Sequence, residues 1–183
     1  KNKYRIPSAR LANWDYRNEG AYFITICTKD RIHYFGEIEN NKMIFSPIGA
    51  IADVLWYELK NHAQNLELGE FVVMPNHIHG ILILTENENR SNTNVGTLHA
   101  TALRSTNNEQ MAKISPKSGS VSVIIRSYKS AVTKHANRLG LDFGWQTRFY
   151  DHIIRNNQSF DTISNYIITN PLNWGKDKLY GKI

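Results

Sequence analysis

The chain has 183 residues and a mass of 21.1 kDa, and its 41% hydrophobic and 21% charged residues indicate one folded domain and exclude a disordered polymer. A single cysteine, Cys27, excludes an internal disulfide framework, and no apolar run approaches the roughly 20 residues that span a bilayer. Because no apolar segment follows the basic N-terminus, no signal peptide is recognised, and we expect a soluble cytoplasmic protein of net charge +6 without a membrane partner.

The first half of the chain carries the patterns of strands, with one helix among them. Short runs of β-branched and aromatic residues bounded by turn signals predict five strands, at 21–28, 33–36, 43–45, 71–74 and 77–84. The second and third of these form a hairpin, because an Asn-Asn pair between them is a turn signal. Pro47 opens the helix, and apolar residues at helical spacing extend it to about His62.

The composition changes between residues 86 and 119, where Asn, Ser, Thr and Glu dominate without periodicity. This pattern predicts a mobile insertion inside a single domain of residues 1–183 rather than a boundary between two domains.

The remainder of the chain predicts two helices separated by a strand. An apolar stripe indicates a helix at 120–139 that ends at Gly140, and a shorter strand follows at 147–154. The last helix is capped by Ser159 and stops before Pro171. This order of elements predicts an α+β fold in which helices pack on one face of an antiparallel sheet.

The positive charge is concentrated in two segments. Residues 1–17 carry a net +4 and residues 113–155 a net +6, whereas residues 18–112 carry −5. A polyanion such as a phosphate backbone is a natural partner for this distribution, and a solubilising surface would explain it equally well.

Two histidines lie two residues apart within the predicted strand 77–84. Because alternate side chains of a strand point to the same face, His77 and His79 project together and could hold a divalent metal with a third ligand. The same pair would also suit the solvent face of a half-buried strand. A histidine-triad nucleotide hydrolase is excluded, because it needs a third histidine where Ile81 stands.

The last helix offers partners for the two histidines. Tyr166 and Asn170 are four residues apart and therefore share a helix face. The amide oxygen could complete a metal site and the phenol could be a nucleophile, although a helical tyrosine is also a common packing residue.

Three motifs in this order resemble a known family. The segment 75–79 (PNHIH) resembles the HUH motif of single-strand DNA transposases and relaxase-like nucleases. The segments 145–156 (WQTRFYDHIIRN) and 166–171 (YIITNP) resemble the signature of the REP-associated tyrosine transposase branch. The resemblance covers roughly residues 16–84 and 120–175.

This resemblance implies a ferredoxin-like or RRM-like fold of the HUH endonuclease type, acting on single-stranded or hairpin DNA. By the same resemblance, His77, His79 and Asn170 would hold a divalent metal, Mg²⁺ or Mn²⁺. Tyr166 would attack the scissile phosphate, leaving a 5′-phosphotyrosine and a free 3′-hydroxyl.

Cationic and aromatic side chains are the features that bind single-stranded DNA. Eight residues of the two basic segments are therefore predicted to contact DNA: Arg126, Lys129, Lys134, Arg138, Arg148, Arg155, Trp14 and Trp145.

Two other functions suit the same residues. One is a domesticated hairpin-DNA-binding module without catalysis, and the other is phosphodiester hydrolysis with water as the nucleophile.

No nucleotide cofactor is expected, because the sequence has no GxxxxGK[ST] loop. A tyrosine pKa is ordinarily about 10, and we expect Arg148, Arg155 and the metal to lower that of Tyr166. Related transposases form dimers, whereas the REP-associated branch can act as a monomer. The resemblance is therefore compatible with either a monomer or a homodimer.

Overall fold

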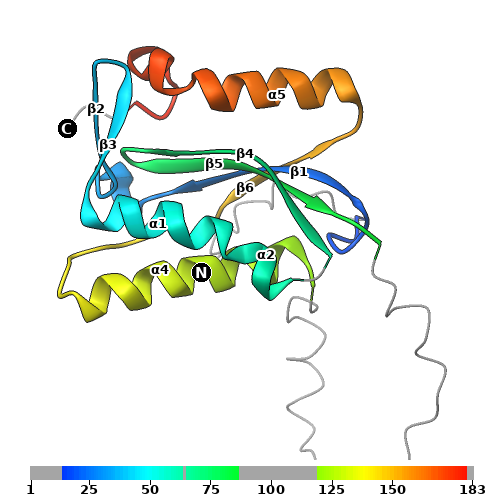
Figure 1. The fold of residues 1–183 in the computed structure, drawn as a ribbon, viewed down its shortest axis with the longest axis horizontal. Coiled ribbons are helices and arrows are strands. Elements are labelled where there is room, and N and C mark those ends of the chain that lie inside the picture. The colour runs from blue at the N-terminus through cyan, green and yellow to red at the C-terminus, as the bar shows by residue number, and fades with distance from the viewer. Residues whose placement is uncertain (1–13, 64, 87–118, 181–183) are drawn as a thin grey trace, which may run out of the picture.

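The computed structural model describes residues 14–63, 65–86 and 119–180, so almost all of the predicted insertion at 86–119 lies outside the described residues. Its centre is a four-stranded antiparallel sheet in the order β4-β5-β1-β6 (Figure 1). The strands are β1 (Gly20–Cys27), β4 (Leu66–Met74), β5 (His77–Leu84) and β6 (Tyr150–Ile154). A separate hairpin joins β2 (Gly36–Glu39) and β3 (Lys42–Phe45).

The helices cover both faces of this sheet (Figure 1). One face carries α1 (Pro47–Tyr57), α2 (Leu59–His62) and α4 (Val121–Arg138), and the other carries α5 (Asn157–Thr169). The predicted α+β class is therefore confirmed, but the expectation that the helices share one face fails for α5. The physical reason is that the strands are apolar on both faces, so both faces need a cover.

The larger core lies between the sheet and the helices α1 and α4. Trp56 of α1 and Tyr128 of α4 are fully buried there beneath Ile78 of β5. Gly80 makes this packing feasible, because a Cβ atom at this position would lie 2.3 Å from the Trp56 indole. Strand β5 therefore packs directly on α1 at Gly80.

A smaller core lies on the other face, under α5. Ile81 of β5, Ile154 of β6 and Ile167 of α5 form its buried centre, and Phe23 of β1 packs against it. This second core fixes the position of α5 over the same sheet face from which His77 and His79 project.

The boundaries of several elements differ from the predicted ones. The hairpin begins at Gly36 rather than at residue 33, and the first helix is interrupted at Glu58. The strand β4 begins five residues early, at Leu66, and Asn156 rather than Ser159 caps α5 by accepting a hydrogen bond from the Ser159 amide. Among the described residues, no helix combines the length and the apolar character that crossing a bilayer requires.

Candidate active site

The two histidines of β5 are buried, not solvent-facing. His77 is 0% exposed and His79 is 2% exposed, and their rings are 4.4 Å apart between centroids. The alternative of a polar pair on a solvated strand face is therefore wrong. Burial of two imidazoles is costly unless their polar atoms have partners, so the partners of each ring matter.

The orientation of His77 is set by its neighbour in the sequence. The Asn76 amide nitrogen donates to the Leu179 carbonyl at 2.9 Å, which turns its Oδ1 toward His77 Nδ1 at 2.8 Å. Because that oxygen accepts, Nδ1 of His77 carries the proton and Nε2 keeps its lone pair. Nε2 is buried and has no hydrogen-bond partner within the part of the chain that the structure describes, as expected for an atom that awaits a ligand.

The orientation of His79 is set across the sheet. The register pairs His79 with Thr25 of β1, and Thr25 Oγ1 lies 2.9 Å from His79 Nδ1. Because Nδ1 is engaged there, Nε2 points toward α5, where the Tyr166 hydroxyl lies 3.2 Å away. The strand and the helix thus bring an imidazole and a phenol into contact.

Tyr166 and Asn170 converge on a third residue, Asp177, which follows the 3₁₀ helix η3 (Pro171–Lys176). The Tyr166 hydroxyl donates to Asp177 Oδ2 at 3.2 Å, and the Asn170 amide nitrogen donates to the same oxygen at 2.9 Å. The other carboxylate oxygen accepts from the Leu179 amide at 2.6 Å. The structure therefore brings His77, His79, Tyr166 and Asn170 together around a carboxylate that the sequence analysis missed.

One sequence signal pointed to Asp177. It is the one acidic residue after Asp161, and it lies between Lys176 and Lys178. An isolated acid within a basic tail just beyond the tyrosine motif is a candidate functional residue, but its distance from the histidines depends on the turn of η3.

The donor set fits a divalent metal. Ligand atoms of His77, His79 and Asp177 all lie within 4.8 Å of one another. The Asn170 Oδ1 atom is also buried and without a hydrogen-bond partner among the described residues. Two imidazole nitrogens with carboxylate and amide oxygens form a mixed set that suits Mn²⁺ at least as well as Mg²⁺, which prefers oxygen.

The protonation of the cluster follows from its burial. Burial lowers the pKa of His79 to about 4 against the opposing effect of Asp177, and burial, assisted by His79, lowers the pKa of His77 well below its ordinary value. Both imidazoles are therefore neutral at neutral pH, the state that a metal ligand needs.

The pKa of Tyr166 is shifted in the direction opposite to the one expected. Burial, followed by the Asp177 carboxylate, raises its pKa to about 12. The pKa is therefore raised, opposite in direction to the lowering expected from Arg148 and Arg155. The phenol is neutral at neutral pH, and the residue placed to take its proton is Asp177.

Four of the predicted DNA-contacting cations share one surface. Arg126, Lys129, Lys134 and Arg138 of α4 line an open groove of about 780 Å³ together with Trp145. Lys129 is half-buried, donates through Nζ to the Gln146 carbonyl at 2.6 Å, and accepts the Trp145 indole N–H on its own carbonyl at 3.1 Å.

The remaining predicted DNA contacts lie elsewhere. Arg148 and Arg155 are exposed on either side of β6, and Trp14 is half-buried and donates its indole N–H to the Tyr22 hydroxyl at 3.1 Å. Trp14 therefore belongs to the packing at the start of β1 and not to the groove on α4.

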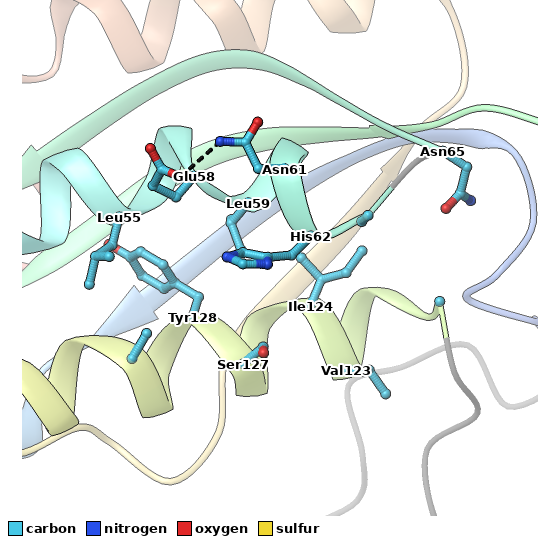
Figure 2. A pocket seen from close by; sticks show the side chains of 13 residues that line it. Leu55, Glu58, Leu59, Asn61, His62, Asn65, Val123, Ile124, Ser127 and Tyr128 are labelled. Atoms are coloured by element: carbon cyan, nitrogen blue, oxygen red, sulfur yellow. Dashed lines mark hydrogen bonds between the residues drawn. The ribbon is translucent and has the colours of Figure 1, made fainter.

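A second groove, of about 660 Å³, lies between α1, α2 and α4 (Figure 2). Leu55, Leu59 and Ile124 are apolar residues of its lining, which also includes Glu58 and His62. It is on the opposite side of the sheet from His77 and His79, so it is separate from the candidate active site.

Comparisons with known proteins bear on the family and on the fold. No protein-family model matches the chain. A protein of Haemophilus influenzae (strain ATCC 51907 / DSM 11121 / KW20 / Rd), described as uncharacterized, is 35% identical over 174 residues, which cover 94% of this chain and 92% of that protein. The two proteins belong to one family.

A solved structure of a REP-associated tyrosine transposase bound to a REP hairpin matches with a TM-score of 0.54 and 20% identity. The match covers 97% of this chain and 77% of that one. The chain therefore shares the fold of that structure. The predicted HUH-type fold is thus confirmed, and in this fold the candidate site lies between β5 and α5.

Proposed function

We propose that this protein is a cytoplasmic, metal-dependent single-strand DNA transposase that cuts and rejoins a strand at hairpin-associated sites. The observation that carries the proposal is the Tyr166 hydroxyl, which contacts both His79 Nε2 and Asp177 Oδ2. A phenol held against an imidazole and a carboxylate is suited to nucleophilic attack on a phosphodiester. The transposase of the same fold is bound to a REP hairpin, which supports hairpin DNA as the partner.

In the proposed step, the phenolic oxygen of Tyr166 forms a bond to the scissile phosphorus while the bond from phosphorus to the 3′ oxygen breaks. Asp177 accepts the phenolic proton, and the departing 3′ oxygen takes a proton from solvent to become a hydroxyl. The downstream strand remains on Tyr166 as a 5′-phosphotyrosine. Because this ester retains the energy of the original bond, a 3′-hydroxyl can displace Tyr166 and rejoin the strands without a nucleotide cofactor.

His77, His79 and Asn170 would hold the divalent ion, with Asp177 as a further oxygen ligand within reach. A bound Mg²⁺ or Mn²⁺ would supply neutralisation of charge on the phosphate oxygens and on the leaving oxygen. The residues themselves contribute orientation, since Asn76 and Thr25 hold the two rings with Nε2 toward the same space.

The basic groove on α4 gives the DNA a route to this site. Trp145, which lines the groove, forms a β-bridge with Thr28 just beyond β1, and Cys27 at the end of β1 pairs with His77. A strand that follows the groove thus reaches the end of the sheet where the histidines lie. Tyr166 contacts His79 of its own chain, which supports a site formed within one protomer.

The test is a covalent adduct. We expect wild-type protein with Mn²⁺ and a pool of hairpin oligonucleotides with randomised single-stranded flanks to form a product that withstands denaturing electrophoresis. A fluorophore at the 3′ end of the DNA stays in the adduct, because Tyr166 retains the 5′ phosphate of the downstream fragment. Tyr166→Phe and His77→Ala should abolish the product.

Tyr180→Phe is the matched control, because Tyr180 is a similarly exposed tyrosine near the same end of the chain, and it should retain the product. Hairpin binding without any adduct would favour the silent binding module instead. Cleavage that persists in Tyr166→Phe but is lost in His77→Ala would favour hydrolysis by water.

A further inference from the structure

The sheet face that carries His79 continues to an exposed tyrosine on the edge strand. Thr25 of β1 pairs with His79 on one side and with Tyr150 of β6 on the other. Directly paired residues of neighbouring strands point to the same face. His79, Thr25 and Tyr150 therefore form one row across the sheet. The row lies on the sheet face that carries α5, and Tyr166 of α5 contacts His79 at one end of the row.

Aromatic contacts connect this row with the proposed nucleophile. The ring of Phe23 is stacked 5.2 Å from His79, and it meets Tyr166 edge-on at 6.2 Å and Tyr150 edge-on at 6.5 Å. Phe23 thus joins Tyr150 and Tyr166 into one aromatic surface, with the two hydroxyl-bearing rings on either side of it.

Tyr150 is the most exposed of these three side chains, with 51% of its area exposed against 44% for Tyr166. The tryptophans are less accessible: Trp56 and Trp174 are buried, and Trp14 and Trp145 are half-buried with their indole N–H groups already donated. The stacking role that composition suggested for tryptophan therefore suits Tyr150 better.

Positive charge flanks Tyr150 along the same edge. Arg148 precedes β6 and Arg155 follows it, and both side chains are exposed. An exposed ring, on a strand that exposed arginines precede and follow and joined through Phe23 to the candidate nucleophile, has the features of a single-strand path: cations for phosphates and a flat ring for a base.

We propose that Tyr150 is a base-stacking residue that positions the single strand at the phosphate attacked by Tyr166. The inference rests on the proposed function and adds the nucleotide contact next to the reacting group. Stacking on a phenol ring accepts every base, so Tyr150 contributes affinity and position rather than base identity. Its role is positioning, because it does not itself touch the reacting atoms.

Binding to two probes tests the proposal: a fluorescent 15-nucleotide oligothymidylate, and an abasic sugar–phosphate strand of the same length. Both are measured by anisotropy in EDTA, so that no cleavage occurs. Tyr150→Ala should weaken oligothymidylate binding by about 5- to 150-fold and leave the abasic strand unchanged. Tyr150→Trp should restore binding, whereas Tyr150→Leu, which keeps apolar bulk on Phe23 without a π face, should behave like Tyr150→Ala.

Tyr57→Ala is the matched control, because Tyr57 is 53% exposed and meets Phe71 edge-on at 5.9 Å on the other face of the sheet. It should bind both probes as the wild type does. The proposal is rejected if Tyr150→Ala and Tyr150→Leu bind oligothymidylate within twofold of wild type, if they lose the abasic strand equally, or if the wild type does not prefer oligothymidylate. This assay measures binding and no cleavage. Failure to form the Tyr166 adduct would therefore reject the transposase activity without changing the outcome of the binding assay.

Discussion

Each histidine of the candidate site has its Nδ1 atom held by a protein partner. For His79 that partner is the Thr25 hydroxyl, which comes from the neighbouring strand at 2.9 Å and is itself 8% exposed. Partners of this kind hold the ring and its tautomer, and their loss typically costs 10- to 100-fold in metal affinity. Thr25 should therefore matter for metal binding although it offers no ligand atom to the metal.

Thr25→Val removes the hydroxyl and keeps the shape of the side chain. We expect it to weaken Mn²⁺ binding about 10- to 100-fold, because the His79 ring loses its anchor. Isothermal titration calorimetry with Mn²⁺ measures this directly. Thr133→Val is the control, since Thr133 donates only to the Lys129 carbonyl within α4, and its Mn²⁺ affinity should stay at the wild-type value. Equal affinities for the two variants would contradict an anchoring role.

The sequence predicts most residues of the site, but neither their burial nor the carboxylate that contacts them. Strand alternation predicts that His77 and His79 share a face, and the motif resemblance points to Tyr166 and Asn170. Their burial was not predictable, because it results from α5 crossing a face that the pattern assigned to solvent. Asp177 was missed because its approach to Tyr166 requires the turn of η3, which has no periodic signal.

Among the elements, β5 carries the strictest packing requirement. The face of β5 opposite the two histidines lies against α1. On this face Gly80, directly after His79, leaves the space that the Trp56 indole fills. A side chain at position 80 would move the strand away from α1 or the indole out of the core. The position of the two histidines therefore depends on contact with a helix on the opposite face.

Gly80→Ala should destabilise the protein by about 1–3 kcal/mol, the usual cost of inserting a methyl group into a packed core. The added Cβ would lie 2.3 Å from the Trp56 ring, so either strand or helix must shift. Urea denaturation followed by circular dichroism gives the free energy of unfolding. Gly175→Ala serves as the control, because a Cβ there meets no atom within 4 Å, and its unfolding free energy should change by less than about 0.5 kcal/mol. Equal stabilities would show that the Trp56 pocket adapts.

Elements with clean periodicity were predicted well, and interrupted ones were not. β1, β5 and α4 agree with their predicted spans to within one residue at every end. The start of β4 was missed because a register irregularity between Leu68 and Phe71 breaks its alternation. The cap of α5 was misassigned because Asn156 and Ser159 are both good capping residues, and only the geometry selects Asn156.

At the scale of the whole molecule, the basic groove and the candidate active site occupy opposite faces of the sheet. They meet at one end, where Trp145 pairs with Thr28 and the Gln146 amide donates to the Cys27 carbonyl at 2.9 Å. A DNA partner that engages both surfaces must pass around this end. The groove should then act on affinity and its salt dependence, and the active site on chemistry.

The double variant Lys134→Gln/Arg138→Gln should reduce the salt dependence of hairpin binding. Each phosphate contact adds about 0.9 to the slope of log affinity against log salt, so the slope should fall by about 2. Fluorescence anisotropy across a range of salt concentrations provides the slope. Lys42→Gln/Lys60→Gln removes two exposed charges outside the groove, from β3 and α2, and should keep the wild-type slope. Identical slopes for both double variants would mean that the groove does not carry the DNA.

The amide of Asn76 couples the proton of His77 to a peptide group 103 residues further along the chain. Were the Leu179 carbonyl to leave, nothing in this bond would stop the amide from rotating by half a turn and offering its NH₂ group to the imidazole. The ring would then accept at Nδ1 and carry its hydrogen on Nε2, the nitrogen that must stay bare to coordinate. The backbone near the C-terminus therefore takes part in keeping one tautomer, and a change in that distant segment would be felt first as a change in coordination chemistry.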